Sequence, residues 1–214
     1  IPTPKIIHHQ PHWLFTEYIQ TNETISLRFF SQHLSLLYKN SETKKMRYGL
    51  NQNNFIGATT QINTQEDSWV NFFKVWRIKF QQKLLLDNRL ISLEQNKSID
   101  KIIKQLHLYL PDQFYPSLCH GDLWIGNVLQ NNKNQIILID PAIYYGDPWS
   151  DIAMYTLFGA NENEVIEKMI PLMKISYCKK AFQVYQLYHL MNHVNLFGQS
   201  YQGRMNQCIS NILK

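Results

Sequence analysis

"HGDLWIGN" at residues 120–127 and "IDP" at residues 139–141 bracket the segment that decides the fold. The residues between them, NVLQ-NNKN-QIILID, form two short apolar runs separated by Asn and Lys. This pattern is typical of a β-hairpin with a turn of about four residues. Because an aspartate and an asparagine precede the hairpin and another aspartate follows it, the hairpin can bring polar side chains together at one end.

The register of this hairpin decides which polar side chains meet. If Gln130 pairs with Gln135, Asn127 lies opposite Leu138, and Asp140 is its diagonal neighbour on the same face. Diagonal neighbours lie roughly 7–8 Å apart. Since Mg²⁺–oxygen bonds are about 2.0–2.1 Å long, both side chains could reach one metal ion.

The charges near the hairpin are consistent with a metal. Between residues 122 and 151 the only cation is Lys133, whereas the segment contains four aspartates, Asp122, Asp140, Asp147 and Asp151. Buried carboxylates need partners, or their pKa rises and they lose their charge. A divalent ion would partner two of them. The alternative is that distant Lys or Arg residues pair with them, or that they cap helices, as Asp147 and Ser150 could.

The spacing of Asp122 and Asn127 matches D-x-x-x-x-N. In protein kinases, the aspartate of this motif accepts the proton of the acceptor hydroxyl and the asparagine binds Mg²⁺. A further kinase aspartate, which follows an apolar strand, holds metal against the nucleotide phosphates, and Asp140 has this context. Three such residues in the same order, with a hairpin between the second and the third, indicate kinase-like chemistry more strongly than any single motif does.

The composition indicates the broad class of protein. The chain has 214 residues, 44% of them hydrophobic, which suits one large domain or two small ones. No apolar run approaches the roughly 18 residues of a membrane span. The three cysteines have no metal or redox spacing, and we expect reduced thiols in a cytoplasmic protein. The net charge is +5, but the basic side chains are spread over predicted helix faces and no nucleic-acid-binding motif accompanies them. We therefore expect no nucleic-acid partner.

Periodicity predicts a mainly helical α+β fold. The predicted elements are a strand over 13–19, a helix capped by Thr24, a long loop over 40–66, an amphipathic helix over 67–91, a helix capped by Ser98 that ends before Pro111, and helices over 149–214 broken near Gly159, Pro171 and Gly198. On the apolar side of the long helix we expect Trp69, Phe72, Phe73, Trp76, Phe80 and Leu84.

Two other motifs are weaker. Gly121 and Gly126 match the glycines of a Walker phosphate loop, but Asn127 and Val128 replace the required Lys and Ser/Thr, which excludes it. His189 and His193 have the helical spacing of metal ligands but lack a third ligand. We favour buried, hydrogen-bonded histidines in a core rich in aromatic residues.

These residues resemble the fructosamine kinases (ketosamine 3-kinases), in the aminoglycoside phosphotransferase branch of the protein-kinase-like fold. The resemblance covers nearly the whole chain. The blocks that carry it are HGDLWIGN, IDPAIYYGDPWSDIAMYTLFG, NNFIGATTQIN, WVNFFKVWRI and YQLYHLMNHVNLFG. "HGD" with a later aspartate occurs in many small-molecule phosphotransferases, whereas "HGDLW" together with "DPAIYYGD" is far more specific.

The resemblance implies an ATP- and Mg²⁺-dependent kinase that phosphorylates a sugar hydroxyl of ketosamines, free or protein-bound, in protein deglycation repair. It assigns the following residues: Asp122 as catalytic base, Asn127 and Asp140 as Mg²⁺ ligands, and the backbone of Glu17, Tyr18 and Ile19 as the adenine-binding hinge. It further implies that Asp151 steadies the catalytic loop, that His120 shapes it, and that Trp124 is a wall for the sugar, though Trp124 could equally belong to the core.

The sequence also departs from the family. The helix after the hinge usually ends Leu-His, but here it ends Leu37-Tyr38. We expect residues 1–20 to be a remnant of an N-terminal lobe with its hinge, and residues 21–214 to be the catalytic lobe. With the N-terminal lobe largely missing, we expect this chain alone to be inactive and monomeric. The alternatives are a phosphotransferase for choline, an aminoglycoside or another sugar, and a catalytically silent scaffold.

Overall fold

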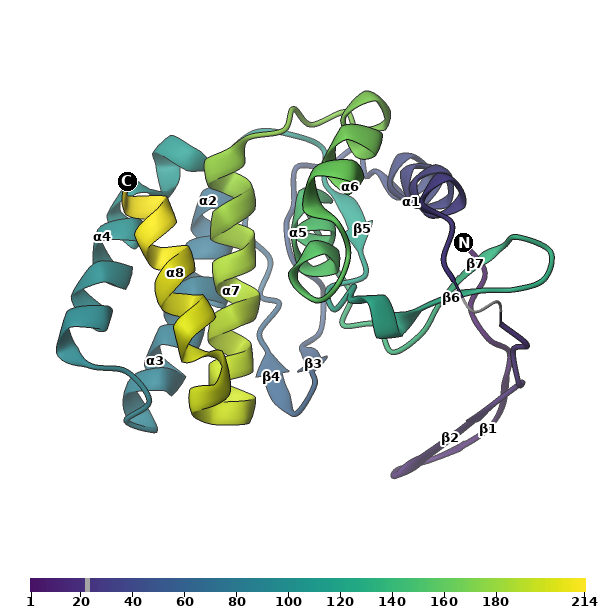
Figure 1. Cartoon of the computed structure of the whole chain (residues 1–214), viewed down its shortest axis with the longest axis horizontal. Coiled ribbons are helices and arrows are strands. Elements are labelled where there is room, and N and C mark those ends of the chain that lie inside the picture. The colour runs from purple at the N-terminus through teal and green to yellow at the C-terminus, as the bar shows by residue number, and fades with distance from the viewer. Residues whose placement is uncertain (22–23) are drawn as a thin grey trace.

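The computed structural model, which describes residues 1–21 and 24–214, is a helical body with short two-stranded antiparallel sheets (Figure 1). The helices are α1 (Leu27–Ser41), α2 (Trp69–Phe72), α3 (Phe80–Asp87), α4 (Leu93–Tyr109), α5 (Trp149–Leu157), α6 (Glu162–Met169), α7 (Lys179–Phe197) and α8 (Gln202–Leu213). The strand pairs are β1 (Ile6–Gln10) with β2 (Trp13–Thr16), β3 (Asn54–Ile56) with β4 (Thr59–Gln61), β5 (Ser117–Cys119) with β8 (Tyr144–Gly146), and β6 (Val128–Gln130) with β7 (Ile136–Leu138). The predicted α+β class is confirmed.

Helix α7 is the centre of the body. It contacts α8, α5 and α3, and Figure 1 shows it between α8 on one side and α5 on the other. A helix that is apolar on all sides belongs in a core, and α7 buries side chains around its whole circumference. The predicted breaks are confirmed, since α5 ends before Gly159, α6 ends before Pro171, and α7 ends at Gly198.

The long helix predicted over residues 67–91 is present, but its middle is a π-helix over Phe73–Lys79. A π-helical turn holds more residues than an α-helical turn, so the buried face shifts along the sequence after it. For this reason Leu85 is fully buried in place of the predicted Leu84. The same segment carries the charged side chain of Arg77 into the interior, where it has no exposed surface.

Two predicted helix starts are wrong. Helix α4 begins at Leu93, where Ser92 accepts a hydrogen bond from the N–H of Gln95 and Gln95 reciprocates, so Ser98 lies inside the helix. Helix α1 begins after Ser26 rather than at Thr24. In the first case a complete capping box outweighs the later serine.

Two predictions about extended segments also need correction. The predicted loop over 40–66 contains the β3–β4 hairpin. In the β6–β7 hairpin, Gln130 pairs with Ile136 instead of Gln135. With this register five residues, 131–135, separate the two strands, and Asn134 among them adopts a left-handed conformation (φ 59°), which asparagine tolerates. Asn127 therefore lies beside Ile139, whose N–H donates to the Asn127 carbonyl at 3.1 Å.

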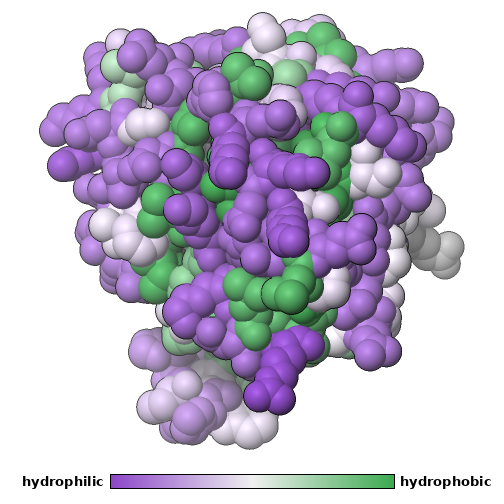
Figure 2. All heavy atoms as spheres, turned by 90° about the vertical axis from the view of Figure 1, so that its left-hand side faces the viewer, coloured by the Kyte–Doolittle hydropathy of each residue, from purple (hydrophilic) through white to green (hydrophobic). Residues whose placement is uncertain are grey.

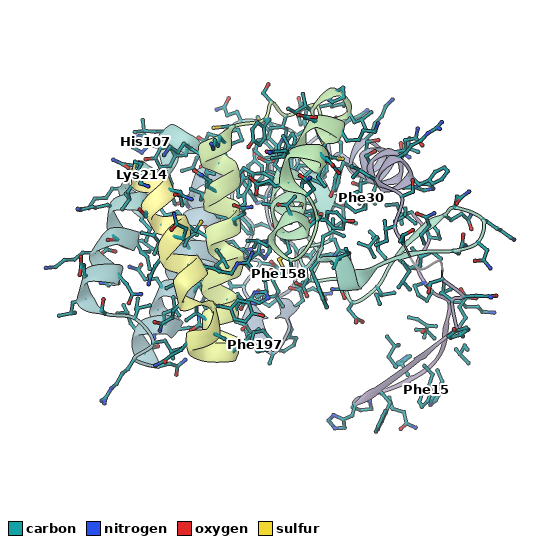
Figure 3. The ribbon with its side chains drawn as sticks, viewed as in Figure 1. Phe15, Phe30, His107, Phe158, Phe197 and Lys214 are labelled. Carbon is teal, nitrogen blue, oxygen red and sulfur yellow. The ribbon has the colours of Figure 1, made fainter. Side chains whose placement is uncertain are left out.

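The β1–β2 hairpin projects from the helical body (Figure 1). Every residue of both strands is exposed, and Phe15 lies far from the core aromatics, as Figure 3 shows. The predicted strand over 13–19 is present as the shorter β2, which ends at Thr16. The proposed division at residue 20 stays a prediction.

The side of the body next to α4 and α8 is mainly hydrophilic (Figure 2). Its apolar side chains form small groups separated by polar ones. In the described part of the chain, no helix is both long and apolar enough to cross a membrane.

Asp147 lies buried just before α5, whose N-cap residue is Pro148, so neither Asp147 nor Ser150 is the cap that the sequence suggested. The carboxylate of Asp147 accepts hydrogen bonds from the N–H of Trp149 (2.9 Å) and the hydroxyl of Tyr185 (2.7 Å). Burial raises the pKa of Asp147 to about 6, although both hydrogen bonds act in the opposite direction.

The capping box of α4 gives a first prediction. Ser92→Ala removes the acceptor for the N–H of Gln95 and should lower the free energy of unfolding by about 1 kcal/mol. In the matched control, Ser98→Ala replaces a mid-helix serine and should leave stability unchanged or raise it by up to roughly 0.5 kcal/mol. Urea unfolding measures both. Equal losses in the two variants would contradict the assigned helix start.

The buried carboxyl of Asp147 gives a second prediction. Because its folded-state pKa is raised, its stabilising effect is full below about pH 4 and is lost as the pH rises through about 6. We expect the free energy of unfolding of the wild type, relative to Asp147→Asn, to increase by about 1 kcal/mol from about pH 7 to about pH 5. A difference that stays constant or falls on acidification would show that Asp147 is already charged and well solvated.

Candidate active site

The loop after β5 is held by the carboxylate of Asp151, which comes from the first turn of α5. One carboxylate oxygen accepts the N–H of His120 at 2.7 Å, and the other accepts the N–H of Gly121 at 2.8 Å. Burial raises the pKa of Asp151, while the hydrogen bonds to its charged form lower it. The predicted position of Asp151 behind the loop thus agrees with the geometry.

Tyr38 occupies the position where the sequence departs from the family pattern. Its hydroxyl lies in the core and donates to Oδ2 of Asp151 at 3.0 Å. Burial, followed by the charge of Asp151, raises the pKa of Tyr38 well above its usual value, so the phenol keeps its proton. Sequence reasoning noted the unusual tyrosine but missed this contact.

Gly121 allows the loop to approach the segment after Asp140. Its φ of 82° lies in the left-handed region, and a Cβ built there would be 2.0 Å from the carbonyl oxygen of Ala142. Any side chain would therefore push the two segments apart. They are also joined directly: the N–H of Ala142 donates to the carbonyl of His120 at 2.8 Å, and Nε2 of His120 lies 2.9 Å from the carbonyl of Ile139.

Asp122 and Asn127 meet side by side. Nδ2 of Asn127 donates to the carbonyl of Asp122 at 2.9 Å and lies 3.5 Å from its Oδ2. Burial raises the pKa of Asp122, and the nearby charges of Asp151 and Asp140 raise it further. The changed register removes the diagonal pairing predicted for Asn127 and Asp140, but the charge of Asp140 still contributes to the pKa of Asp122.

The donor set fits a magnesium ion. Because Nδ2 of Asn127 is committed to Asp122, its Oδ1 points elsewhere, and the carboxylate of Asp140 is exposed. Both are hard oxygen ligands, which Mg²⁺ prefers together with water and phosphate oxygens. The described residues contain no group of three or more His, Cys, Asp or Glu side chains that could hold a metal ion. An ion at Asn127 and Asp140 would therefore need ligands from the nucleotide.

Asp122 also lines a cavity of about 290 Å³ between α5, α7 and the β3–β4 hairpin. Trp124 forms one wall and is 40% exposed. Its ring lies so close over Gly126 that a Cβ there would be 2.3 Å away. Phe158 and Phe197 line the cavity as well, and Figure 3 shows them near the lower end of α7. A cavity with a carboxylate and aromatic walls suits a polyol that stacks and hydrogen-bonds.

The predicted hinge lies at the base of the β1–β2 hairpin. The N–H of Glu17 donates to the carbonyl of Lys5 at 3.0 Å and is therefore not free for a ligand. Tyr18 is 90% exposed. The structure does not bring Glu17, Tyr18 or Ile19 into the cavity that Asp122 lines.

The two histidines on α7 are both at least partly buried. Nδ1 of His193 lies 2.8 Å from the carbonyl of His189, as expected for a hydrogen-bonded histidine. Neither ring nitrogen of His189 has a partner among the described residues. Burial lowers the pKa of His189 to about 3, so the ring is neutral. The prediction of hydrogen-bonded histidines therefore holds for His193 only.

Comparison with known proteins agrees with the resemblance. The family described as fructosamine kinase matches residues 2–214. A protein of Vibrio parahaemolyticus, named as a probable ketoamine kinase, is 36% identical over 187 residues, which are 86% of this chain and 62% of that protein. The protein-ribulosamine 3-kinase of Arabidopsis thaliana chloroplasts is 33% identical over 181 residues, covering 85% of this chain and 55% of the relative. The chain thus spans less than two thirds of these relatives.

Solved structures share the fold. A Thermobifida fusca protein assigned as a fructosamine-3-kinase superposes with a TM-score of 0.86 at 23% identity, covering 98% of this chain and 73% of that one. An ADP-bound aminoglycoside phosphotransferase gives 0.55 at 14% identity, covering 100% and 75%. The predicted protein-kinase-like fold of the aminoglycoside phosphotransferase type is confirmed, and the chain belongs to the fructosamine kinase family.

Proposed function

We propose that this chain is the catalytic part of an ATP-dependent kinase that phosphorylates a sugar hydroxyl of ketosamines, as a step in protein deglycation repair. The observation that carries the proposal is the contact of Asn127 with Asp122, which lines a cavity with aromatic walls. Membership of a family whose relatives are named ketoamine and ribulosamine kinases supports the acceptor class.

Asp122 would orient the acceptor hydroxyl toward the phosphate and accept its proton at a carboxylate oxygen. Phosphoryl transfer depends mainly on positioning and charge neutralisation. The raised pKa of Asp122 makes its carboxylate a somewhat stronger base. Trp124 would form the wall along which the sugar lies, while Asp151 and His120 keep the loop in place.

Asn127 and Asp140 would hold Mg²⁺, which offsets the charge of the triphosphate when bound. The adenine would lie against the hinge. Since the N–H of Glu17 is already committed to Lys5, the N–H groups of Tyr18 and Ile19 are the donors that we expect it to use. ADP in a solved aminoglycoside phosphotransferase of this fold supports a nucleotide in that branch.

We also propose a domain division, a cellular location, an oligomeric state and a class of acceptors for this protein. Residues 21–214 form the catalytic lobe and are preceded by the hinge. We infer a cytoplasmic monomer whose acceptors are free or protein-bound ketosamines. Incubation of the full-length protein with ATP and fructosyl-lysine, ribulosyl-lysine or choline, read as transfer of the γ-phosphate, tests the acceptor class. Phosphorylation of choline alone would replace the proposal with another small-alcohol kinase, and no transfer to any alcohol would favour a silent scaffold.

Asp122→Asn gives a prediction about chemistry. In the full-length protein the variant keeps the shape of the side chain but cannot accept a proton, so kcat should fall by about 10²–10⁴-fold. Nucleotide affinity, measured by calorimetry, should stay near that of the wild type. Unchanged turnover would refute the role of Asp122.

Asp140→Asn gives a prediction about the metal. Loss of the carboxylate should abolish the dependence of nucleotide binding on Mg²⁺, since an amide is a much weaker ligand for a hard cation. Calorimetry with and without Mg²⁺ measures this, and Asp122→Asn is the matched control that should keep the dependence. If Asp140→Asn binds nucleotide with the Mg²⁺ dependence of the wild type, Asp140 is not a ligand.

A further inference from the structure

Arg77 is a buried cation with no buried anion beside it. It has no exposed surface, and none of the ion pairs among the described residues involves it. Its guanidinium lies 4.4 Å from the ring centroid of Tyr144 and 4.6 Å from that of Phe72. Nη1 donates to the carbonyl of Ile62 at 2.6 Å. Aromatic faces and carbonyls offset part of the desolvation cost, but an apolar side chain would fill this space without any such cost.

The charge of Arg77 fixes the direction of a buried chain of hydrogen bonds. A guanidinium can only donate, so Nη2 must face Oδ1 of Asn63, at 2.7 Å. Nδ2 of Asn63 then points away and donates to Oδ1 of Asn54 at 2.9 Å. Nδ2 of Asn54 is left to donate to the carbonyl of Ile143, also at 2.9 Å. Each amide can take only one orientation because Arg77 sets the first.

Gln61 joins the same chain from the next strand. Its Oε1 accepts the hydroxyl of Tyr188 at 3.1 Å, so its Nε2 donates to Oδ1 of Asn54 and to the carbonyl of Ala142, both at 2.8 Å. We call Arg77, Asn63, Asn54 and Gln61 the amide relay. Hydrogen bonds that run in one direction from a charge polarise and strengthen each other.

The relay ends on the backbone that follows Asp140. Asp140 has a φ of 50°, a left-handed conformation that costs a non-glycine residue about 1–2 kcal/mol. Such strain persists only where surrounding contacts impose it. On one side His120 bonds the carbonyl of Ile139 and the N–H of Ala142. On the other side, Asn54 and Gln61 bond the carbonyls of Ile143 and Ala142.

We propose that the amide relay is a positioning device that holds the turn at Asp140, and so decides where its carboxylate stands. None of the four relay side chains lines the cavity beside Asp122, so they act through Asp140 and the catalytic loop. The binding of Mg²⁺ by this carboxylate rests on the proposed function. The support of the turn by the amide relay rests on the hydrogen bonds alone.

Asn63→Asp separates the relay from simple packing. The new carboxylate gives Arg77 a counter-charge, so the fold should persist. The second carboxylate oxygen, however, replaces the Nδ2 of Asn63 that donated to Oδ1 of Asn54. The side-chain amide of Asn54 must therefore rotate by about half a turn so that its Nδ2 donates to the new carboxylate. The amide oxygen of Asn54 then meets the carbonyl of Ile143 and leaves that carbonyl without its donor. Asn54→Asp produces the same loss without touching Arg77.

The direct readout is hydrogen exchange at the amide of Ala142, followed by NMR, with circular dichroism to confirm the fold. A buried acceptor left without its donor costs about 1–3 kcal/mol, so both variants should lower the protection of Ala142 by about tenfold or more. Tyr188→Phe keeps the ring beside Arg77 and removes only the donor to Gln61. It should lower protection by about threefold, and it covers the case in which the first two variants fail to fold.

The matched control is Gln82→Glu, the same amide-to-carboxylate change in another pair of hydrogen bonds, which are partly buried. Gln82 donates to Asn96 and Asp100 between α3 and α4, which lie on the opposite side of the body from the β6–β7 hairpin (Figure 1). This variant should lose stability while the protection of Ala142 relative to Val194 in α7 stays as in the wild type. A second readout is the affinity for Mg²⁺ with ATP, which the relay variants should weaken by about tenfold and Gln82→Glu should not.

Three outcomes separate the claims. Wild-type protection of Ala142 in the folded relay variants, Tyr188→Phe included, overturns the relay whatever the protein phosphorylates. Loss of protection with unchanged Mg²⁺ and nucleotide affinity overturns the link between the turn and the metal. If the wild-type protein transfers phosphate to no ketosamine, the proposed function fails, while the exchange data still decide whether the relay holds the turn.

Discussion

The loop that carries Asp122 depends on one carboxylate, that of Asp151, which does not line the cavity. Asp151 accepts the backbone N–H groups of His120 and Gly121 and the hydroxyl of Tyr38. These bonds connect the loop to α5 and to α1 at once. A buried carboxylate is costly unless it is hydrogen-bonded, and three donors satisfy it here. Once the loop is fixed in this way, Gly121 can pack against the carbonyl of Ala142, and the side chains of Asp122 and Asn127 come together.

Much of the site could be predicted because its signals are local. Asp122 and Asn127 are close in sequence, and a short hairpin must return the chain to Asp140. The break at Gly159 and the strand pair β6–β7 could be predicted for the same reason. The register could not, because it depends on whether Asn134 accepts a left-handed conformation, and asparagine allows both outcomes. The start of α4 was predicted at Ser98, but the helix begins after Ser92, because Ser92 and Gln95 form a reciprocal pair of hydrogen bonds.

What the sequence could not reveal lies in contacts between distant segments. Tyr38 and Asp151 are 113 residues apart, and Asn54 reaches Ile143 across 89 residues. Asparagine and glutamine in a predicted loop give no sign that they will be buried, and the buried charge of Arg77 depends on a π-helical turn that periodicity does not predict. These residues are important because the side chain of a metal ligand must be held in a fixed position. A turn strained at Asp140 stays in place only if its neighbours hold it.

We propose that Asn127 and Asp140 hold one divalent ion beside Asp122 and the acceptor cavity. Mn²⁺ prefers the same oxygen ligands as Mg²⁺ and is paramagnetic, so it broadens the NMR signals of nearby nuclei. Titration of the isotope-labelled protein with Mn²⁺ and ADP tests the claim directly. If one ion lies beside all three residues, the amide signals of Asp122, Asn127 and Asp140 should broaden first and together. Broadening centred elsewhere, or at only one of the three, would contradict the claim.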